Sequence, residues 1–168
     1  MTTIRDRREE ILERLDALLA GTTIMLSSGT IPAGNYVHNR NELPASLVPG
    51  IILLDGDETN DTRLTRAPGL QQGQVPTQLV KMTPEIYVVL DVRKPLNLNV
   101  GADLNLARRV ILAAILPDPS LQASVGANGN IVYDGCVTDL ARNRQMQGQL
   151  GISITFTYPL LPWETVGQ

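Results

Sequence analysis

The hydrophobic positions of the first twenty residues follow the period of an amphipathic helix. Thr3 is a candidate N-cap, and Gly21 is a candidate helix stop. On the polar side, Glu10 and Arg14 have the spacing of a favourable ion pair. The segment is therefore expected to be a helix that covers a flat apolar surface. The apolar residues that share one helical stripe are Ile4, Ile11, Leu12, Leu15, Leu18 and Leu19.

The next segments predict short strands and one long connection. Thr23–Leu26 and Asn35–Asn39 are strand candidates in a region rich in Gly, Pro and Asn. The apolar run Ile51–Leu54 predicts a strand buried on both faces, closed by the turn signal Asp55-Gly56. Thr59–Val80 is rich in Gln, Pro and Gly and has no period, so we expect a projecting arm there.

A strand, a helix and a hairpin are predicted in the second half. Thr83–Arg93 alternates between apolar and polar residues, as a half-buried strand does. A helix is expected from about Asp103 until Pro117 stops it. Asn130–Arg142 and Gln149–Tyr158 predict a long antiparallel hairpin. The core stripe expected on this helix is Leu104, Ala107, Ile111, Ala114 and Ile115.

The order of these elements indicates the fold class. Helix, two or three strands, helix and two strands predict an α+β fold, with an antiparallel or mixed sheet and two helices packed on one face. There is no internal repeat in the sequence. We expect a single domain over residues 1–168, with a flexible arm at about 59–80.

The composition excludes several classes of protein. The chain has 168 residues, of which 43% are hydrophobic and 18% charged, so it can bury a core. Its longest apolar run, Val110–Leu116, is far shorter than the roughly 20 residues of a membrane span. The N-terminus is charged from Arg5 and lacks the apolar stretch of a signal peptide, which predicts a cytosolic protein. Cys136 is the single cysteine, so no internal disulfide is possible.

The charge balance argues against sequence-specific binding of nucleic acid. Fourteen basic and seventeen acidic residues give a net charge of −3, whereas duplex binders carry a basic face. Twelve of the fourteen basic residues are Arg, the residue favoured in interface ion pairs. Genome composition explains the same bias equally well.

One motif has the residues of an enzyme. The strand Ile51–Leu54 followed by Asp55, Asp57 and Thr59 is similar to the motif of haloacid-dehalogenase-type phosphatases, in which the carboxylates act as nucleophile and general acid. Lys81 is a candidate phosphate lysine. However, no helix is predicted after the motif, and no later apolar strand ends in the paired Asp that would hold magnesium. We favour an acidic turn, and a magnesium phosphohydrolase is a remote alternative.

Two other reactive residues are interpreted as structural. His38 stands beside Asn39, Arg40 and Asn41, which indicates a solvated or interface loop. Cys136 lies in the predicted hairpin with no histidine nearby in sequence, so we expect a buried or half-buried structural thiol. No catalytic, cofactor-binding or metal-binding residue is predicted, and no cofactor is expected.

The second predicted helix suggests a contact between subunits. Asn105, Arg108, Arg109 and Leu112 share the face opposite the core stripe. Leu112 is out of place on a solvated face, so we expect this face to lie against another chain. Arg40 is a further candidate for an interface between subunits or with a partner.

Several local signatures, taken with the order of elements, resemble the tail terminator (minor tail) proteins of long-tailed bacteriophages. The resemblance covers nearly the whole chain, although each piece is degenerate. The matching pieces are Val37–Pro44, Pro49–Glu58, Pro84–Leu90, the predicted helix Leu104–Leu116, Asn130–Gly135 and Tyr158–Leu160.

The resemblance implies a structural virion protein and no enzymatic activity. Members of the family form a ring, usually a hexamer, that caps the tail tube at its head-facing end and docks to the head–tail connector. DNA passes through such a ring without sequence-specific binding. The expected location is the head-proximal end of the tail, after assembly in the host cytoplasm. Another head–tail joining protein or a tail-tube component is the alternative.

Overall fold

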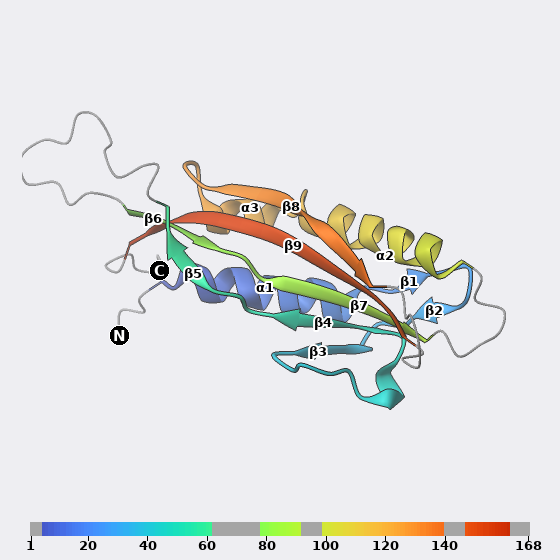
Figure 1. Cartoon of the computed structure of the whole chain (residues 1–168). Helices are drawn as coiled ribbons and strands as arrows, with labels where there is room; N and C mark the ends of the chain where they lie inside the picture. The colour runs from blue at the N-terminus through green and yellow to red at the C-terminus, as the bar shows by residue number, and fades with distance from the viewer. Residues whose placement is uncertain (1–4, 62–77, 92–98, 140–146, 162–168) are drawn as a thin grey trace, which may run out of the picture.

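The computed structural model describes residues 5–61, 78–91, 99–139 and 147–161. Its elements follow one another in a helix, strand, helix and hairpin order (Figure 1). They are α1 (Arg7–Gly21), β1 (Ile24–Met25), β2 (Thr30–Ile31), β3 (Tyr36–His38), the 3-10 turn η1 (Ala45–Leu47), β4 (Gly50–Leu54), β5 (Glu58–Asn60), β6 (Gln78–Met82), β7 (Glu85–Asp91), α2 (Val100–Ile115), α3 (Pro119–Val125), β8 (Asn130–Asp139) and β9 (Gln147–Leu160).

A twisted sheet of seven strands is built around the long strand β9. On one side, β9 pairs with β7 and then with β6, and on the other side it pairs with β8. Beyond β7 lie β4 and β3, and beyond β6 lies β5. The β3–β4 pair is parallel and the other pairs are antiparallel, so the sheet is mixed. β1 and β2 form a separate small hairpin.

The helices lie on one face of this sheet (Figure 1), which confirms the predicted α+β fold. The third helix, α3, was not predicted. Its sequence carries the usual start signals, because Asp118 accepts a hydrogen bond from Leu121 N at 2.9 Å and Pro119 occupies the first turn. It is only seven residues long, too short for its period to stand out.

The main core fills the space between the helices and the sheet. The predicted α1 stripe is buried except for the half-buried Leu18, and its first residue, Ile4, lies outside the described residues. The core face predicted for Thr83–Arg93 is confirmed up to Asp91, and residues 92 and 93 lie outside the described residues. In α2, the predicted stripe is buried except for the half-buried Ala114. The apolar face of the second hairpin strand is buried at Leu150, Ile152, Ile154, Phe156 and Tyr158.

The ends of the first helix differ from the prediction. Asp6, not Thr3, is the N-cap, and it accepts a hydrogen bond from Glu9 N. The predicted pair of Glu10 with Arg14 is replaced by pairs with other residues. Glu10 binds Arg5 at 2.8 Å, and Arg14 binds Asp118 at 2.6 Å. A local contact with Arg5 and a tertiary contact with Asp118 therefore take the place of the i,i+4 pair.

The second helix begins at Val100, earlier than the expected start at Asp103. Asp103 is buried inside the first turn and ties the helix to the hairpin of β1 and β2. Its carboxylate accepts hydrogen bonds from the backbone N–H and the hydroxyl of both Ser27 and Ser28. This contact joins segments far apart in sequence, so the local pattern did not predict it.

The Asp55-Gly56 signal does not reverse the chain. β4 and β5 continue in the same direction along the sheet. β4 pairs with β7, and β5 pairs with β6, the strand that comes just before β7 in the chain. Gly56 has a φ of +71°, and a Cβ there would lie 1.9 Å from the carbonyl oxygen of Thr83. The strand does end at Leu54 as the signal predicts, but Gly56 allows a close approach to Thr83, between β6 and β7, and does not form a tight chain reversal.

Both ends of the predicted arm belong to the sheet. Thr59 pairs with Lys81 and Asn60 with Val80 in the β5–β6 ladder. The arm expected at 59–80 is therefore wrong at both ends, which are strand residues. Residues 62–77 lie outside the described residues, as do residues 140–146 of the predicted hairpin connection.

Candidate functional site

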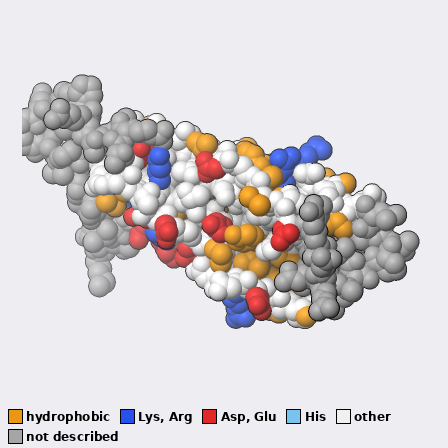
Figure 2. Space-filling view, in the orientation of Figure 1, with side chains coloured by type: hydrophobic (Ala, Val, Ile, Leu, Met, Phe, Trp, Pro, Cys, Tyr) orange, Lys and Arg blue, Asp and Glu red, His pale blue; other side chains and the backbone are white. Residues whose placement is uncertain are grey.

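The sheet face opposite the helices carries a row of residues that runs across five neighbouring strands. Cross-strand partners place Val37, Ile52, Tyr87, Gly151 and Val137 in register on β3, β4, β7, β9 and β8. This face is turned toward the viewer in Figures 1 and 2, with apolar side chains near its middle and acidic ones around them.

The β3 half of this face is covered by the loop that follows β3. Leu43 and Leu47 of that loop pack against Val37, Ile52 and neighbouring apolar residues in a second, smaller core. Among the described residues, nothing comparable covers the β8 half. The open part of the face is therefore the part that lies over β7, β9 and β8 (Figure 2).

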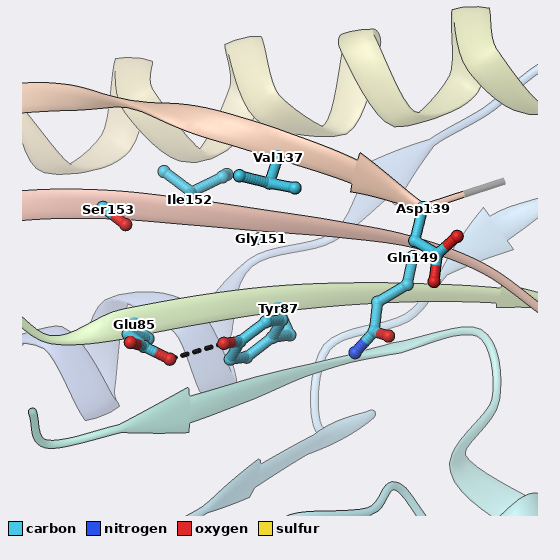
Figure 3. A pocket seen from close by; sticks show the side chains of 8 residues that line it. All are labelled: Glu85, Tyr87, Val137, Asp139, Gln149, Gly151, Ile152 and Ser153. Atoms are coloured by element: carbon cyan, nitrogen blue, oxygen red, sulfur yellow. Dashed lines mark hydrogen bonds between the residues drawn. The ribbon is translucent and has the colours of Figure 1, made fainter.

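A shallow pocket of about 310 Å³ lies on this open part, which we call the slot. Gly151 forms its floor, between Tyr87 of β7 and Val137 of β8 (Figure 3). A Cβ at Gly151 would lie 3.0 Å from the ring of Tyr87, so the ring partly fills the space left by the missing side chain. Val137 is 77% exposed on the other flank.

The rim of the slot is polar and acidic. Glu85 and Ser153 stand on one side of the central row, and Gln149 and Asp139 stand on the other. The Tyr87 hydroxyl donates a hydrogen bond to Glu85 (Figure 3), and this bond, with burial, raises the pKa of the phenol. The lining residues include two carboxylates and neither Lys nor Arg. The slot thus combines an apolar floor with negative charge.

The slot was not predicted from the sequence. A glycine inside an alternating strand, such as Gly151, is the signal that could have indicated it. That signal becomes useful only with the strand register, which places Tyr87 and Val137 on either side.

The slot opens onto β8, which forms one edge of the sheet. β8 has ten residues, pairs with β9 on one side and exposes Val132 and Val137. It contains neither Lys nor Pro, two residues that commonly protect edge strands, although a bulge interrupts its register between Tyr133 and Gly135. The opposite edge consists of β3 and β5, of three residues each. The two edges are therefore unlike.

The predicted interface face of α2 is only partly exposed. Asn105 and Arg109 are exposed, but Arg108 is half-buried and donates a hydrogen bond to the Tyr133 hydroxyl at 3.4 Å. Leu112 is half-buried and packs against the main core. Leu112 is therefore explained by contacts within the chain and gives no argument for a neighbour. The Nε atom of Arg108 is buried and has no hydrogen-bond partner among the described residues.

Arg40 lies just after β3, at the edge of the sheet opposite β8. It follows Asn39, which has a φ of +52° and whose backbone N–H still bonds Leu53 O of β4 at 2.8 Å. The Arg40 side chain is exposed, and no described residue forms an ion pair or hydrogen bond with it.

His38 occupies a different environment from the solvated or interface loop that the sequence suggested. It is the last residue of β3, and its Nε2 lies 2.5 Å from Asp55 Oδ1 while its Nδ1 lies 3.2 Å from Asp16 Oδ1. Asp16 also accepts a hydrogen bond from the Tyr36 hydroxyl at 2.7 Å. The histidine thus links α1 with the end of β4.

The acidic motif is used in these internal contacts. Asn39 donates to Asp55 Oδ2 at 2.9 Å, so both oxygens of this carboxylate have partners. Burial acts to raise the pKa of Asp55, but the hydrogen bonds from Asn39 and His38 outweigh it and the pKa lies below its ordinary value. Lys81 lies 3.5 Å from Asp61. Within the described ranges, no three His, Cys, Asp or Glu side chains are grouped to hold a metal ion.

Cys136 is exposed, not buried or half-buried as expected. Its register partner on β9 is Ile152, a core residue, but Cys136 stands on the edge strand, where a side chain keeps contact with water. The thiol has no described histidine near it that would suggest nucleophilic chemistry.

The chain matches no protein-family model and no curated protein. In the part of the chain that the structure describes, no helix has the length and apolar character needed to span a membrane.

Proposed function

We propose that this protein is a structural subunit of a long-tailed bacteriophage, a tail terminator that assembles into a ring. The ring would cap the tail tube and dock to the head–tail connector. The observation that carries the proposal is the sheet itself, with one long edge, one edge of short strands and a face that is uncovered over β7, β9 and β8. The resemblance of the sequence to that family is the second support for the proposal.

Unlike edges favour head-to-tail association. When two different surfaces of one chain bind each other, the contact is heterologous and repeats to give a closed ring or an open filament. A ten-residue edge strand with exposed Val132 and Val137 offers backbone donors and acceptors to a neighbour. The homo-oligomeric ring, which we take to be a hexamer from the resemblance, uses such a contact.

The charge of the chain suits a DNA conduit. With a net charge of −3 and acidic side chains on the open face (Figure 2), a ring would repel phosphate groups and let DNA pass without binding it. The geometry around Asp55 gives no support to phosphatase chemistry, because His38 and Asn39 already bind the carboxylate.

Electron microscopy of the purified full-length chain, alone and with tail tubes of its phage, tests this proposal. We expect closed rings with a central channel wide enough for duplex DNA, bound at one end of each tube. Tubes or filaments formed by this chain alone would instead identify a tail-tube component. A monomer that binds neither itself nor tubes would contradict both forms of the proposal.

A further inference from the structure

The slot has the chemistry of a receptor for a single cationic side chain. Its floor, Gly151, lacks a side chain, and its flanks, Tyr87 and Val137, are apolar. At about 310 Å³ it lies at the small end of binding pockets, which run from roughly 300 to 1,000 Å³. Glu85 and Asp139 supply negative charge at opposite corners of this floor.

Arginine fits this combination better than any other side chain. Its aliphatic stem covers apolar surface while the guanidinium binds carboxylates through a planar fork. The guanidinium also stacks on aromatic faces, and the Tyr87 ring lies beside Gly151 in the slot. The hydrogen bond from the Tyr87 hydroxyl fixes Glu85 next to the ring.

The position of the slot limits the direction from which such an arginine arrives. Val137 and Asp139 belong to β8, so the slot extends to the edge strand of the sheet (Figure 3). In the proposed head-to-tail ring, the β8 edge of one copy would meet the opposite edge of the next copy, to which β3 belongs. Arg40 is exposed directly after β3, and no described residue of its own chain binds it.

We propose that the slot of each subunit receives Arg40 of the neighbouring copy and that this contact fixes the register of the ring. The Arg40 stem lies over Gly151 and Val137, and the guanidinium binds Glu85 beside the Tyr87 ring, while Asp139 at the opposite corner adds negative charge to the rim. The inference rests on the proposed ring and adds to it a named donor and acceptor.

Charge reversal on each side of the contact tests this assignment. The first variant is Arg40→Glu, and the second, which we call the reversed slot, is Glu85→Arg with Asp139→Arg. Glu85 and Asp139 are exposed, so both variants should fold, and circular dichroism checks that they do. Each variant alone should weaken assembly about tenfold or more, read as the shift in apparent dissociation constant by light scattering.

An equimolar mixture of the two variants gives the sharper result. The mixture contains two kinds of contact between unlike copies. The Arg40→Glu variant keeps its acidic slot, which can bind Arg40 of the reversed-slot variant. The reversed slot is basic and can bind the carboxylate that Arg40→Glu introduces. Every contact is again between opposite charges when the copies alternate. We therefore expect the mixture to recover oligomers that neither variant forms alone. Glu13→Arg, which reverses an exposed acidic residue on α1, is the matched control and should assemble like the wild type.

The possible failures are distinguishable. Wild-type rings together with variants that assemble normally would overturn the Arg40 contact and leave the proposed function standing. Variants that dissociate but do not recover on mixing would also overturn it, since a different basic partner would then occupy the slot. A wild-type chain that stays monomeric at every concentration would overturn both the contact and the ring. If the reversed slot fails to fold, Asp139→Asn should still weaken assembly by about twofold to fivefold.

Discussion

Asp103 holds the start of α2 to the β1–β2 hairpin, and removing its carboxylate should destabilise the protein. The side chain is 1% exposed and accepts hydrogen bonds at 2.8 and 2.7 Å from Ser27 and at 3.2 and 2.5 Å from Ser28. Hydrogen bonds to a charged group contribute about 1.5–3 kcal/mol each, but they are not additive and the serine groups regain water when freed. We therefore expect Asp103→Ala to lower the free energy of unfolding by about 3 kcal/mol.

The replacement Asp103→Asn keeps the shape of the side chain but removes its charge. It should lower the free energy of unfolding by about half as much as Asp103→Ala. Urea unfolding at one fixed protein concentration measures both values, because assembly would otherwise change the apparent stability. Asn105→Ala, an exposed position on the same helix, is the control and should stay within about 0.5 kcal/mol of the wild type. A loss below about 1 kcal/mol for Asp103→Ala would refute the role assigned to this carboxylate.

The same contact predicts a dependence on pH. Burial acts to raise the pKa of Asp103, but the hydrogen bonds from Ser28 and Ser27 outweigh it and the folded pKa lies below the ordinary value of an aspartate. A lowered folded pKa means that the stabilisation is fully present above the unfolded pKa and is lost as the pH falls through the folded value. The wild type should therefore lose this stability below about pH 4, whereas Asp103→Asn should show a shallower acid limb. Equal acid limbs in the two proteins would contradict the assignment.

Three further predictions concern other contacts. Gly56→Ala should lower the free energy of unfolding by more than about 2 kcal/mol, because the new Cβ would meet the Thr83 carbonyl oxygen. An unchanged midpoint of urea unfolding would show that the strands adjust freely. In the same assay, Asp118→Ala should destabilise the protein more than Arg14→Ala, because Asp118 is buried, binds Arg14 at 2.6 Å and also caps α3. Equal losses of stability in the two variants would contradict the capping role. Arg108→Glu should lower the free energy of unfolding more than Arg109→Glu in the same assay, because Arg108 is half-buried and bonds the Tyr133 hydroxyl whereas Arg109 is exposed. Equal losses would contradict this difference.

The periodic segments were predictable because a repeating pattern of apolar residues can be recognised within a short stretch of sequence. The stripe on α1 and the alternation in β7 and β9 repeat often enough to identify both the element and its buried face. The short helix α3 has too few turns for such a repeat. Its start at Asp118 is tied to Arg14 of α1, a contact between residues far apart in sequence.

The candidate site depends on register, which the sequence alone does not specify. Gly151, Tyr87 and Val137 come from three strands, and only their pairing shows that they form one row. The same holds for Asp55, which reads as an acidic turn in sequence but lies against His38 in the fold. Arg40 was predicted as an interface residue from its polar neighbours, and that assignment stays a prediction.

The mass of the full-length chain in solution tests the central claim most directly. Size-exclusion chromatography with light scattering, run over a wide range of protein concentrations, measures it without any partner. The ring predicts one discrete species whose mass is a fixed multiple of 18.3 kDa, six for a hexamer. A mass of 18.3 kDa at every concentration would contradict the account.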